Sequence, residues 1–295
     1  MKKVYVRIGG GLGNQMFNYA VGKAIAEKSG RMMVLDLSEF VLIHSRRYGL
    51  DHFVGPRQTP RVRPFQFLVF LAARVLQRFG FDKCRAFLRI FGYSCFMAET
   101  AETFKPMFKT LCRGGISAYI SGCYGYMTYI SARSELRHEF TLSCGMSPVS
   151  QKLQHRINDA GEDSVSLHVR RTDYLSLKGG GGAVLDPAYY ARAIERICAL
   201  VPNVRWFVFS DDIAWCREHF ASLQDVVFVE GNEKAPWEDI ALMAHCRNHI
   251  IANSTFSWWG AYLAPDVGHT ICPQQWFRGL ETIPGVMVPE DWIRL

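Results

Sequence analysis

The stretch Val165-Ser-Leu-His-Val169, followed directly by Arg170-Arg-Thr-Asp-Tyr174, is typical of a strand in a parallel sheet that is covered on both sides. Its first five residues form a short, mainly apolar run that ends abruptly in polar residues. A short run of this kind, rich in β-branched residues, predicts a strand, and we expect the strand to be covered on both faces. Four further runs of the same kind follow it, at residues 204–209, 226–229, 249–252 and 270–272.

Helical patterns separate these predicted strands. The clearest begins at Asp186-Pro187, a helix cap followed by proline at the first helical position. Tyr190, Ala193, Ile194 and Ile197 then recur at the spacing of one buried helix face. Further helices are expected at residues 212–220, 237–246 and 255–263. Alternating strands and helices predict a Rossmann-like α/β domain with a parallel sheet covered on both sides.

The first half of the chain opens in the same way. We predict a strand at Lys3–Ile8, a turn at Gly9–Gly13, a helix at Gln15–Lys28 and a strand at Met32–Leu37. Between Gly49 and Gly145 the pattern is not legible. The chain has 295 residues, and at roughly 150 residues per domain this length suggests two domains. We expect one domain at residues 1–155 and the second at residues 156–295.

The formal net charge of +7 is confined to one segment. Residues 57–89 hold eight basic residues and the single acid Asp82, so the rest of the chain sums to zero. A body-wide basic stripe is therefore absent, and we expect no nucleic-acid partner. Within the segment, Phe65–Phe79 is apolar over most of its helical circumference. It is either a buried helix or an interfacial helix on anionic lipid, which would make residues 57–89 a peripheral membrane contact.

The cysteines and the N-terminus bear on location. The nine cysteines form no CxxC pair, and several lie in apolar runs as expected of reduced thiols. The first residues contain too few apolar positions for a signal-peptide core, and no run of about 20 apolar residues occurs. We expect a cytoplasmic protein. The alternative is a protein attached peripherally to the inner face of the cytoplasmic membrane.

Polar side chains follow three of the predicted strands. If the strands are parallel, these side chains meet at one edge of the sheet. Two arginines and the N–H groups that begin the helix after Asn253 suit a diphosphate, and an Asp pair suits a nucleobase or ribose. Each feature also has a structural interpretation: arginines in salt bridges, Asp211-Asp212, Ser254 and Thr255 as helix caps, Trp258-Trp259 as core. The three clusters are His168–Tyr174, Ser210-Asp211-Asp212 and Asn253–Trp259.

The loop Gly9-Gly10-Gly11-Leu12-Gly13-Asn14-Gln15 matches neither common phosphate-binding motif. A G-x-G-x-x-G fingerprint would need glycine where Asn14 or Met16 stands, and a P-loop would need G-K-[ST]. The glycines therefore predict close approach of backbone to a ligand, with Asn14 and Gln15 as amide donors. The alternative is a tight strand–helix turn.

Four blocks together resemble the α-1,2-fucosyltransferases, glycosyltransferase family 11. The H-x-R-R-x-D element is shared with α-1,6-fucosyltransferases and indicates use of GDP-fucose; glycine is common in the family where Thr172 stands. The N-terminal and S-T-F-S-W-W blocks are specific to the α-1,2 family. The blocks are Gly10–Phe17 with Tyr19-Ala20, His168–Tyr174, Ser210–Asp212 and Asn253–Gly260.

The resemblance implies an α/β fold of GT-B type, two Rossmann-like domains facing across a cleft, with the donor in the C-terminal one. It implies inverting transfer of L-fucose from GDP-β-L-fucose to the 2-hydroxyl of a galactoside in a surface glycan, either free or lipid-linked. No metal and no other cofactor would take part. Arg170 would hold the β-phosphate and stabilise the departing GDP. The implied donor-binding residues are His168 (nucleoside), Arg171, Asp211 or Asp212 (guanine or ribose), Asn253, Ser254, Thr255 and Ser257 (phosphates), with Gly11, Asn14 and Gln15 in the N-terminal loop.

An inverting reaction uses either a carboxylate base near the acceptor hydroxyl or a transition state so cationic that none is needed. Asp173 is the candidate base, although it could instead orient Arg170 or Arg171. The glycine-rich loop Lys178–Ala183 is either a lid over the donor or a linker. Three other interpretations stay open: a fucosyltransferase of α-1,6-like linkage, a nucleotide-dependent oxidoreductase, and a non-catalytic glycan-binding module.

Overall fold

The computed structural model describes residues 2–42, 46–97, 101–113, 117–122, 127–176, 184–266, 268–277, 280–283 and 285–295. The chain divides into two compact units, Met1–Thr141 and Leu142–Leu295. The predicted boundary, between residues 155 and 156, falls inside α8 (Pro148–Ala160). This helix packs on α12 (Pro236–His245), so it is part of the second unit. The glycine-rich loop Lys178–Ala183 lies outside the described residues.

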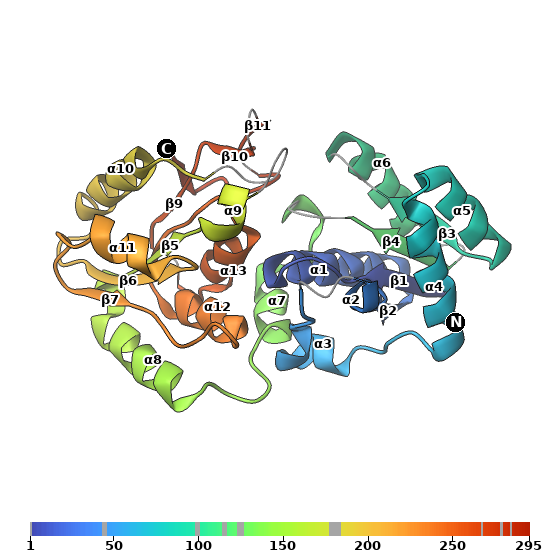
Figure 1. The fold of residues 1–295 in the computed structure, drawn as a ribbon, viewed down its shortest axis with the longest axis horizontal. Coiled ribbons are helices and arrows are strands. Elements are labelled where there is room, and N and C mark those ends of the chain that lie inside the picture. The colour runs from blue at the N-terminus through green and yellow to red at the C-terminus, as the bar shows by residue number, and fades with distance from the viewer. Residues whose placement is uncertain are drawn as a thin grey trace. The chain divides into compact units, whose positions relative to one another are not determined.

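The first unit is built on a four-stranded parallel sheet, in the order β2-β1-β4-β3 (Figure 1). Its strands are β1 (Lys3–Arg7), β2 (Met32–Asp36), β3 (Ser94–Met97) and β4 (Ala118–Ser121). Its helices are α1 (Leu12–Ser29), α2 (Glu39–Leu42), α3 (Val54–Gln58), α4 (Pro64–Gln77), α5 (Phe81–Ile90), α6 (Ala101–Cys112) and α7 (Arg133–Glu139), with 3-10 turns at Leu50–His52 and Met127–Tyr129.

The core of this unit consists of short apolar strands and one long helix. Central β1 is buried on both faces, as the sequence pattern predicts. Helix α1 follows it after the glycine loop and ends at Gly30, whose φ of 62° is the left-handed conformation that commonly terminates helices. Strands β3 and β4 come from the region whose pattern was not legible, and they complete the sheet beside β1.

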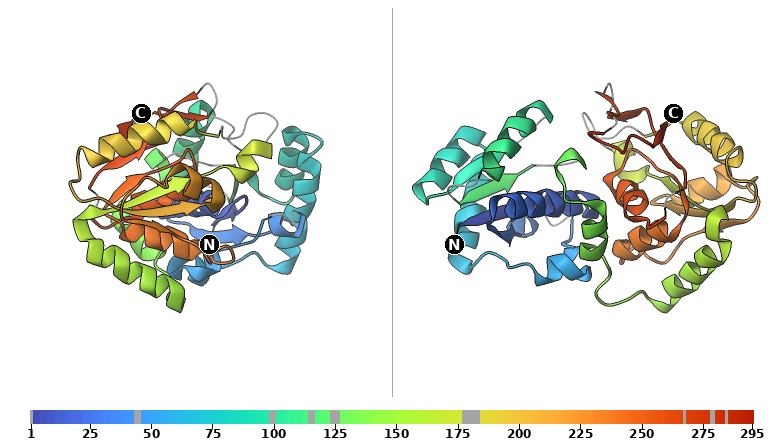
Figure 2. Two further views of the ribbon diagram at one scale, coloured as in Figure 1. Left: turned by 60° about the vertical axis from the view of Figure 1, so that its left-hand side comes forward. Right: turned by 180° about the vertical axis from the view of Figure 1, so that it is seen from behind.

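The second unit has a six-stranded parallel sheet in the order β12-β9-β8-β5-β6-β7. Its helices lie on both faces of the sheet, as Figure 2 shows from two further sides. The strands are β5 (Ser164–Val169), β6 (Arg205–Ser210), β7 (Val226–Phe228), β8 (Asn248–Ile250), β9 (Thr270–Cys272) and β12 (Ile293–Arg294). The helices are α8, α9 (Thr172–Ser176), α10 (Pro187–Cys198), α11 (Ile213–His219), α12 and α13 (Thr255–Leu263), with a 3-10 turn at Gly161–Asp163 and a hairpin of β10 (Gln275–Phe277) and β11 (Leu280–Glu281).

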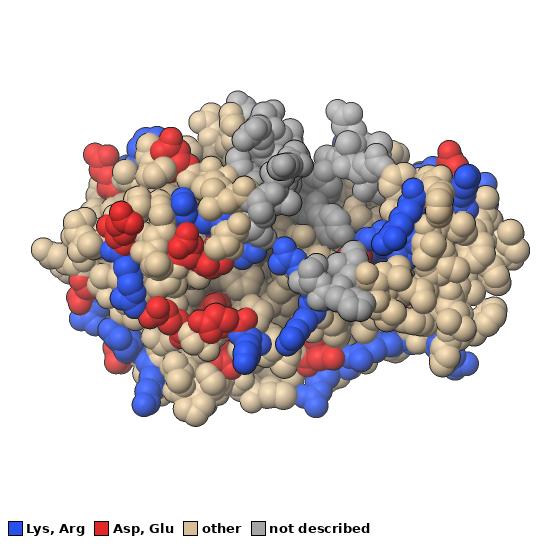
Figure 3. Space-filling model, in the orientation of Figure 1, with Lys and Arg blue, Asp and Glu red and all other residues tan. Residues whose placement is uncertain are grey.

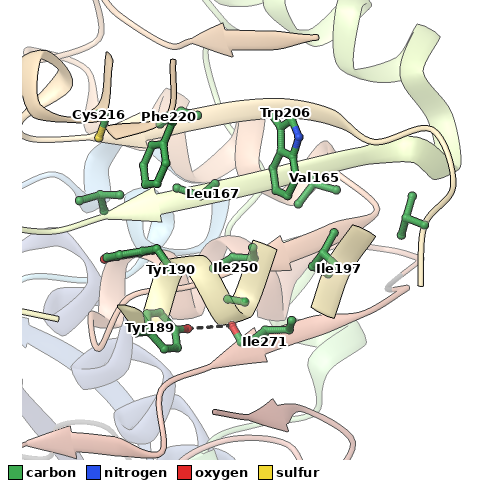
Figure 4. Close-up of a cluster of buried hydrophobic side chains, with 14 residues drawn as sticks. Val165, Leu167, Tyr189, Tyr190, Ile197, Trp206, Cys216, Phe220, Ile250 and Ile271 are labelled. Atoms are coloured by element: carbon green, nitrogen blue, oxygen red, sulfur yellow. Dashed lines mark hydrogen bonds between the residues drawn. The ribbon is translucent and has the colours of Figure 1, made fainter. Parts of the chain in front are cut away.

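A continuous apolar core lies between this sheet and α10 (Figure 4). Asp186 caps α10 by accepting a hydrogen bond from the backbone N–H of Ala188 at 2.8 Å, and Pro187 starts the helix, as predicted. The buried face of α10 includes Tyr190 and Ile197, which pack against Leu167 of β5 and its neighbours. The hydroxyl of Tyr189 donates to the carbonyl of Ile251 at 2.7 Å, so this buried polar group is satisfied.

The α/β class and both parallel sheets are therefore confirmed. None of the helices in the described part of the chain has the length and hydropathy needed to cross a bilayer. The eight cysteines described are free thiols.

Candidate functional site

The order of strands in the second unit singles out one edge of its sheet. From β5 the chain proceeds to β6 and β7 on one side, and it then returns to β8 and β9 on the other side of β5. The two halves of the sheet diverge between β5 and β8, and such a switch point is where open α/β sheets bind ligands, beyond the carboxyl ends of the strands. All three polar clusters predicted from the sequence follow β5, β6 or β8.

Neighbouring pairs in the sheet bring these clusters together. Val169 at the end of β5 pairs with Ser210 at the end of β6, and Leu167 of β5 pairs with Ile250 of β8. The hydroxyl of Tyr174 donates to the backbone carbonyl of Asn253 at 3.0 Å, joining the segment after β5 to the segment after β8. The predicted convergence of the three clusters is confirmed.

Asp211 holds the loop that carries the arginines. Its carboxylate accepts hydrogen bonds from the backbone N–H of Arg171 at 2.9 Å and of Thr172 at 3.2 Å, and from the Thr172 hydroxyl at 2.5 Å. It also lies 3.3 Å from Nε of Arg170, whose side chain is about a quarter exposed at 24%. The Asp211 carboxylate therefore fixes the loop while the Arg170 guanidinium still reaches solvent.

Arg171 is held by α11. Its Nε lies 3.2 Å from Oδ2 of Asp212, and its guanidinium stacks over the ring of Trp215 at 4.3 Å from the centroid. Asp212 is also the N-cap of α11, because Oδ1 accepts from the backbone N–H of Trp215 at 3.2 Å. Asp212 thus makes a capping contact and both aspartates make salt bridges, the contacts that the sequence left open as an alternative to contacts with a base or ribose.

The histidine of the motif is buried and neutral. His168 is 3% exposed on β5, with its ring centroid 5.6 Å from that of Phe256. Burial, with Arg170 nearby, lowers the pKa of His168 to about 3. Among the described residues, its Nδ1 has no hydrogen-bond partner. An unpartnered polar atom at this depth is uncommon and marks a place where a ligand atom or water completes the bonding.

The start of α13 combines a cap with a packed core. Ser254 caps the helix by accepting from the backbone N–H of Phe256 at 3.3 Å, and Asn253 donates from Nδ2 to the carbonyl of Trp276 at 3.2 Å. Ser257 is fully buried and donates to the carbonyl of Ser254 at 3.4 Å, so its hydroxyl faces the protein. Thr255 is partly exposed at the first turn. Trp258 and Trp259 are core residues, at 1% and 0% exposed, and not stacking platforms for sugars.

The glycine loop lies in the first unit, at the carboxyl end of β1. Gln15 is buried, and its side-chain amide is hydrogen-bonded to backbone groups of the neighbouring loops. Its Nε2 donates to the carbonyls of Gly10 at 2.9 Å and Arg47 at 2.8 Å, and its Oε1 accepts from the backbone N–H of Gly49 at 3.0 Å. Gln15 therefore shapes the loop from inside. Asn14 is partly exposed on the first turn of α1.

Two residues that the sequence did not single out support this loop. Glu39 accepts from the backbone N–H of Gly10 at 3.0 Å through Oε1, and its Oε2 pairs with Arg7 at 2.6 Å. Arg7 also donates to Oγ of Ser121 on β4 at 2.6 Å. Neither residue belongs to a recognisable motif. The one signal in the sequence is that Arg7 is a charged residue at the end of an otherwise apolar strand.

A cavity of about 470 Å³ lies elsewhere in the first unit, beside the amino end of β2. Its polar lining is internally paired, since Lys23 contacts Glu27 at 2.5 Å and Glu139 at 3.2 Å. None of the predicted site residues lines it. Within the described residues, no three His, Cys, Asp or Glu side chains group as metal ligands. The side chain of Asp173, the candidate base, lies outside the described residues.

Comparison with known proteins identifies the class. The family model of glycosyl transferase family 11 matches residues 114–279. The α-1,2-colitosyltransferase of Escherichia coli is 32% identical over 314 aligned residues, covering 100% of this chain and 99% of the relative. Galactoside α-(1,2)-fucosyltransferase 1 of Ateles belzebuth is 36% identical over 141 residues, covering 45% of this chain and 38% of that protein. The crystal structure of NodZ α-1,6-fucosyltransferase soaked with GDP-fucose has a TM-score of 0.54 at 17% identity, covering 90% of this chain and 93% of that one.

Fold and similarity together define a glycosyltransferase of GT-B type, with one Rossmann-like unit in each half of the chain. The chain belongs to glycosyl transferase family 11, the family of α-1,2-fucosyltransferases that the four sequence blocks resemble. The resemblance drawn from the sequence is therefore confirmed at the level of family and fold.

Proposed function

We propose that the protein transfers L-fucose from GDP-β-L-fucose to the 2-hydroxyl of a galactoside, with inversion and without a metal ion. The observation that carries this proposal is the meeting of two anion-binding features at the switch point between β5 and β8. One is the loop with Arg170 and Arg171, and the other is the start of α13. A guanidinium binds phosphate oxygens in bidentate geometry, and a helix N-terminus presents N–H groups to an anion.

The residues then take distinct roles. Arg170 binds the β-phosphate and stabilises the charge that develops on GDP as the glycosidic bond breaks. Such preorganised donors contribute about 3 to 4 kcal/mol each in well-studied enzymes. Arg171, stacked on Trp215, completes the diphosphate site, and Thr255 with the N–H groups of α13 faces the same anion. Because the pKa of His168 is about 3, its imidazole is neutral at physiological pH and suits a hydrogen bond to the nucleoside.

The remaining donor residues position these groups. Asp211 and Asp212 hold the arginine loop, while Asn253, Ser254 and Ser257 shape the start of α13. Asp173 is the general base for the acceptor hydroxyl, unless the transition state is cationic enough to need none. We assign acceptor recognition to the first unit. In its loop, Gly11 and Asn14 remain proposed donor-binding residues, since a Cβ at Gly11 would meet no protein atom within 4 Å, whereas Gln15 is buried and bonded within the protein.

A second candidate is the same α-1,2 transfer with colitose as the sugar. It is favoured by the Escherichia coli relative, an α-1,2-colitosyltransferase whose similarity extends over the whole chain. The galactoside fucosyltransferase of Ateles belzebuth is similar over less than half of it. Colitose lacks one hydroxyl that fucose carries. A site that hydrogen-bonds this hydroxyl would discriminate strongly against colitose, whereas a site that merely has room for it would not.

The test is a donor and product assay on the purified chain in the presence of EDTA. GDP-fucose and GDP-colitose are each offered with a panel of galactosides, and NMR determines the linkage of the product. We expect an α-1,2-fucosyl product. A colitosyl product with no fucosyl product would select the second candidate, and an α-1,6 linkage would contradict both.

Ligand binding separates the proposal from an oxidoreductase or a glycan-binding module. GDP at about 100 times its Kd should stabilise the protein by about 2.7 kcal/mol without added metal, and NAD should not. A shift of the melting temperature by NAD or by free oligosaccharide, with none by GDP, would overturn the proposed function.

A further inference from the structure

Helices α4 and α5 form an antiparallel hairpin that is anchored on the first sheet by its inner face. Val69, Phe70 and Ala73 of α4 and Cys84 and Leu88 of α5 are buried in one cluster with residues of the sheet. At the ends of the hairpin, the rings of Phe65 and Phe91 approach to 6.2 Å between centroids. The helix predicted at Phe65–Phe79 is therefore buried on one side only.

The outer face of the same hairpin is also apolar. Seven of the eleven exposed large hydrophobic residues in the described part of the chain belong to residues 65–91. Leu68 and Val75 lie two helical turns apart on α4, and Phe79 follows just after the end of this helix. Leu68 and Phe79 are 63% and 66% exposed. Ile90 at the end of α5 is 80% exposed. The complete set is Phe65, Leu68, Val75, Phe79, Phe81, Ile90 and Phe91, which we term the hairpin surface.

Exposed cations surround this surface. Arg78 and Lys83 flank Phe79 and Phe81 at the turn between the helices, and Arg89 adjoins Ile90 at the other end of α5. The only acid in residues 57–89 is Asp82, which lies 3.5 Å from Arg85. In Figure 3 the surface over α4 and α5 is largely tan with Lys and Arg at its margin. By contrast, Arg61 and Arg74 of the same segment pair with acids of their own unit, Asp51 and Glu39.

We propose that the hairpin surface docks on an anionic phospholipid bilayer, with α4 and α5 lying in the plane of the headgroups. A lipid surface matches both features, because it accepts exposed aromatic and aliphatic side chains and attracts Arg and Lys by its negative potential. A second copy of the chain matches poorly, since a symmetric contact would place two copies of residues 65–91, each with five basic residues and one acid, against each other. This inference is independent of the proposed transferase activity.

The first experiment is co-sedimentation of the full chain with vesicles of phosphatidylcholine, with and without phosphatidylglycerol. We expect binding to the anionic vesicles and little to the neutral ones. Binding should weaken strongly at about 1 M NaCl, where charges are screened within ~3 Å. Absence of binding to the anionic vesicles would overturn the proposal.

Two sets of variants locate the contact. Phe79→Ser with Phe81→Ser removes apolar contacts, and Arg78→Gln with Lys83→Gln and Arg89→Gln should weaken partitioning by about a hundredfold. The matched controls change exposed residues of the second unit. Val149→Ser is the control for the apolar variant, and the triple Lys152→Gln, Arg156→Gln, Arg196→Gln removes the same net charge as the triple variant of the hairpin. Equal losses in control and hairpin variants would show attraction by net charge alone and would overturn the proposal.

A last measurement separates lipid from protein partners and from the active site. All variants should retain GDP binding and transfer to a water-soluble acceptor, so that loss of vesicle binding is not loss of fold. If analytical ultracentrifugation finds a dimer that Phe79→Ser with Phe81→Ser dissociates, and vesicles do not bind, the hairpin surface is a protein interface and the inference is wrong.

Discussion

Three consecutive glycines at the carboxyl end of β1 are glycines for different reasons. A Cβ at Gly9 would lie 2.3 Å from a carboxylate oxygen of Glu39, so packing requires glycine there. Gly10 has a φ of +72°, which residues with a side chain rarely adopt. Gly11 has a φ of −69°, and a Cβ there would meet no protein atom within 4 Å. The fold itself does not require glycine at position 11, which favours a ligand near its backbone.

Gly11→Ala should therefore separate folding from function. We expect the free energy of unfolding to change by less than about 1 kcal/mol, the range of an N-cap substitution, and the rate of sugar transfer to fall. Thermal melts and initial rates on the same preparations check this. Gly22→Ala is the contrasting variant, because its Cβ would lie 2.4 Å from Cγ2 of Val6 and should lower stability. Wild-type rates for Gly11→Ala would contradict a role of this loop in binding.

At the residue scale, the sequence predicts which residues gather but not what each side chain does. His168, Arg170 and Asn253 could be placed at one edge because parallel strands end together. The inward direction of Gln15 and Ser257 could not, since it depends on hydrogen bonds to distant backbone groups at Arg47 and Gly49 and on the packing of α13. The support of the loop by Arg7 and Glu39 likewise depends on tertiary contacts that no local motif announces.

At the element scale, α8 and α12 are joined by a network of buried and half-buried polar groups. Glu238 in the first turn of α12 accepts from the backbone N–H and the hydroxyl of Ser147, at 3.0 and 2.7 Å. Asn232 donates to Oδ1 of Asp239 at 2.9 Å and to Oγ of Ser150 at 3.0 Å. Burial raises the pKa of Asp239 from 3.8 to about 6. This network ties the helix that enters β5 to the rest of the second unit.

The raised pKa of Asp239 predicts a pH-dependent contribution to stability. Between about pH 4 and pH 6 the folded state binds this proton more tightly than the unfolded state, so the contribution to stability falls as pH rises. Asp239→Asn keeps an oxygen for Asn232 and removes the charge. The variant should be more stable than the wild type by about 1 to 3 kcal/mol above pH 6 and equal to it near pH 4.

Denaturant unfolding at a series of pH values measures this difference, with Asp266→Asn as the exposed control. A variant that is less stable than the wild type at pH 8 would show that the Asp239 carboxylate is needed in its charged form.

Elements with local signals were predictable, and those without were not. Asp186, Pro187 and a periodic apolar face specified α10, and short apolar runs specified β5 to β9. Strands β3 (Ser94–Met97) and β4 (Ala118–Ser121) have four residues each. Four residues are too few for a hydrophobic periodicity that would distinguish a strand from a short helix. They become strands because they pair beside β1, which is a tertiary effect.

At the scale of the whole molecule, the two units repeat one principle. Each has a parallel sheet whose central strand ends in a loop that leads into a helix: Gly9–Gly11 before α1, and Arg170-Arg171 before α9. The second unit adds the two arginines that we propose to bind the diphosphate, and the first adds the hairpin surface. The net charge of +7 therefore belongs to residues 57–89, which include most of the hairpin, whereas the arginines proposed for chemistry lie where the charges of the chain balance.

If Arg170 stabilises the departing GDP, removing its guanidinium must slow fucose transfer by a protein that is still folded. Initial rates of fucose transfer from GDP-fucose to a galactoside are compared for the wild type and Arg170→Ala, with circular dichroism to show that both are folded. We expect kcat to fall by about a hundredfold to a thousandfold, the usual effect of losing one transition-state donor. Arg217→Ala, which removes an exposed arginine paired with Glu230, should leave the rate unchanged. A folded Arg170→Ala protein that transfers fucose at nearly the wild-type rate would show that Arg170 does not stabilise the departing GDP.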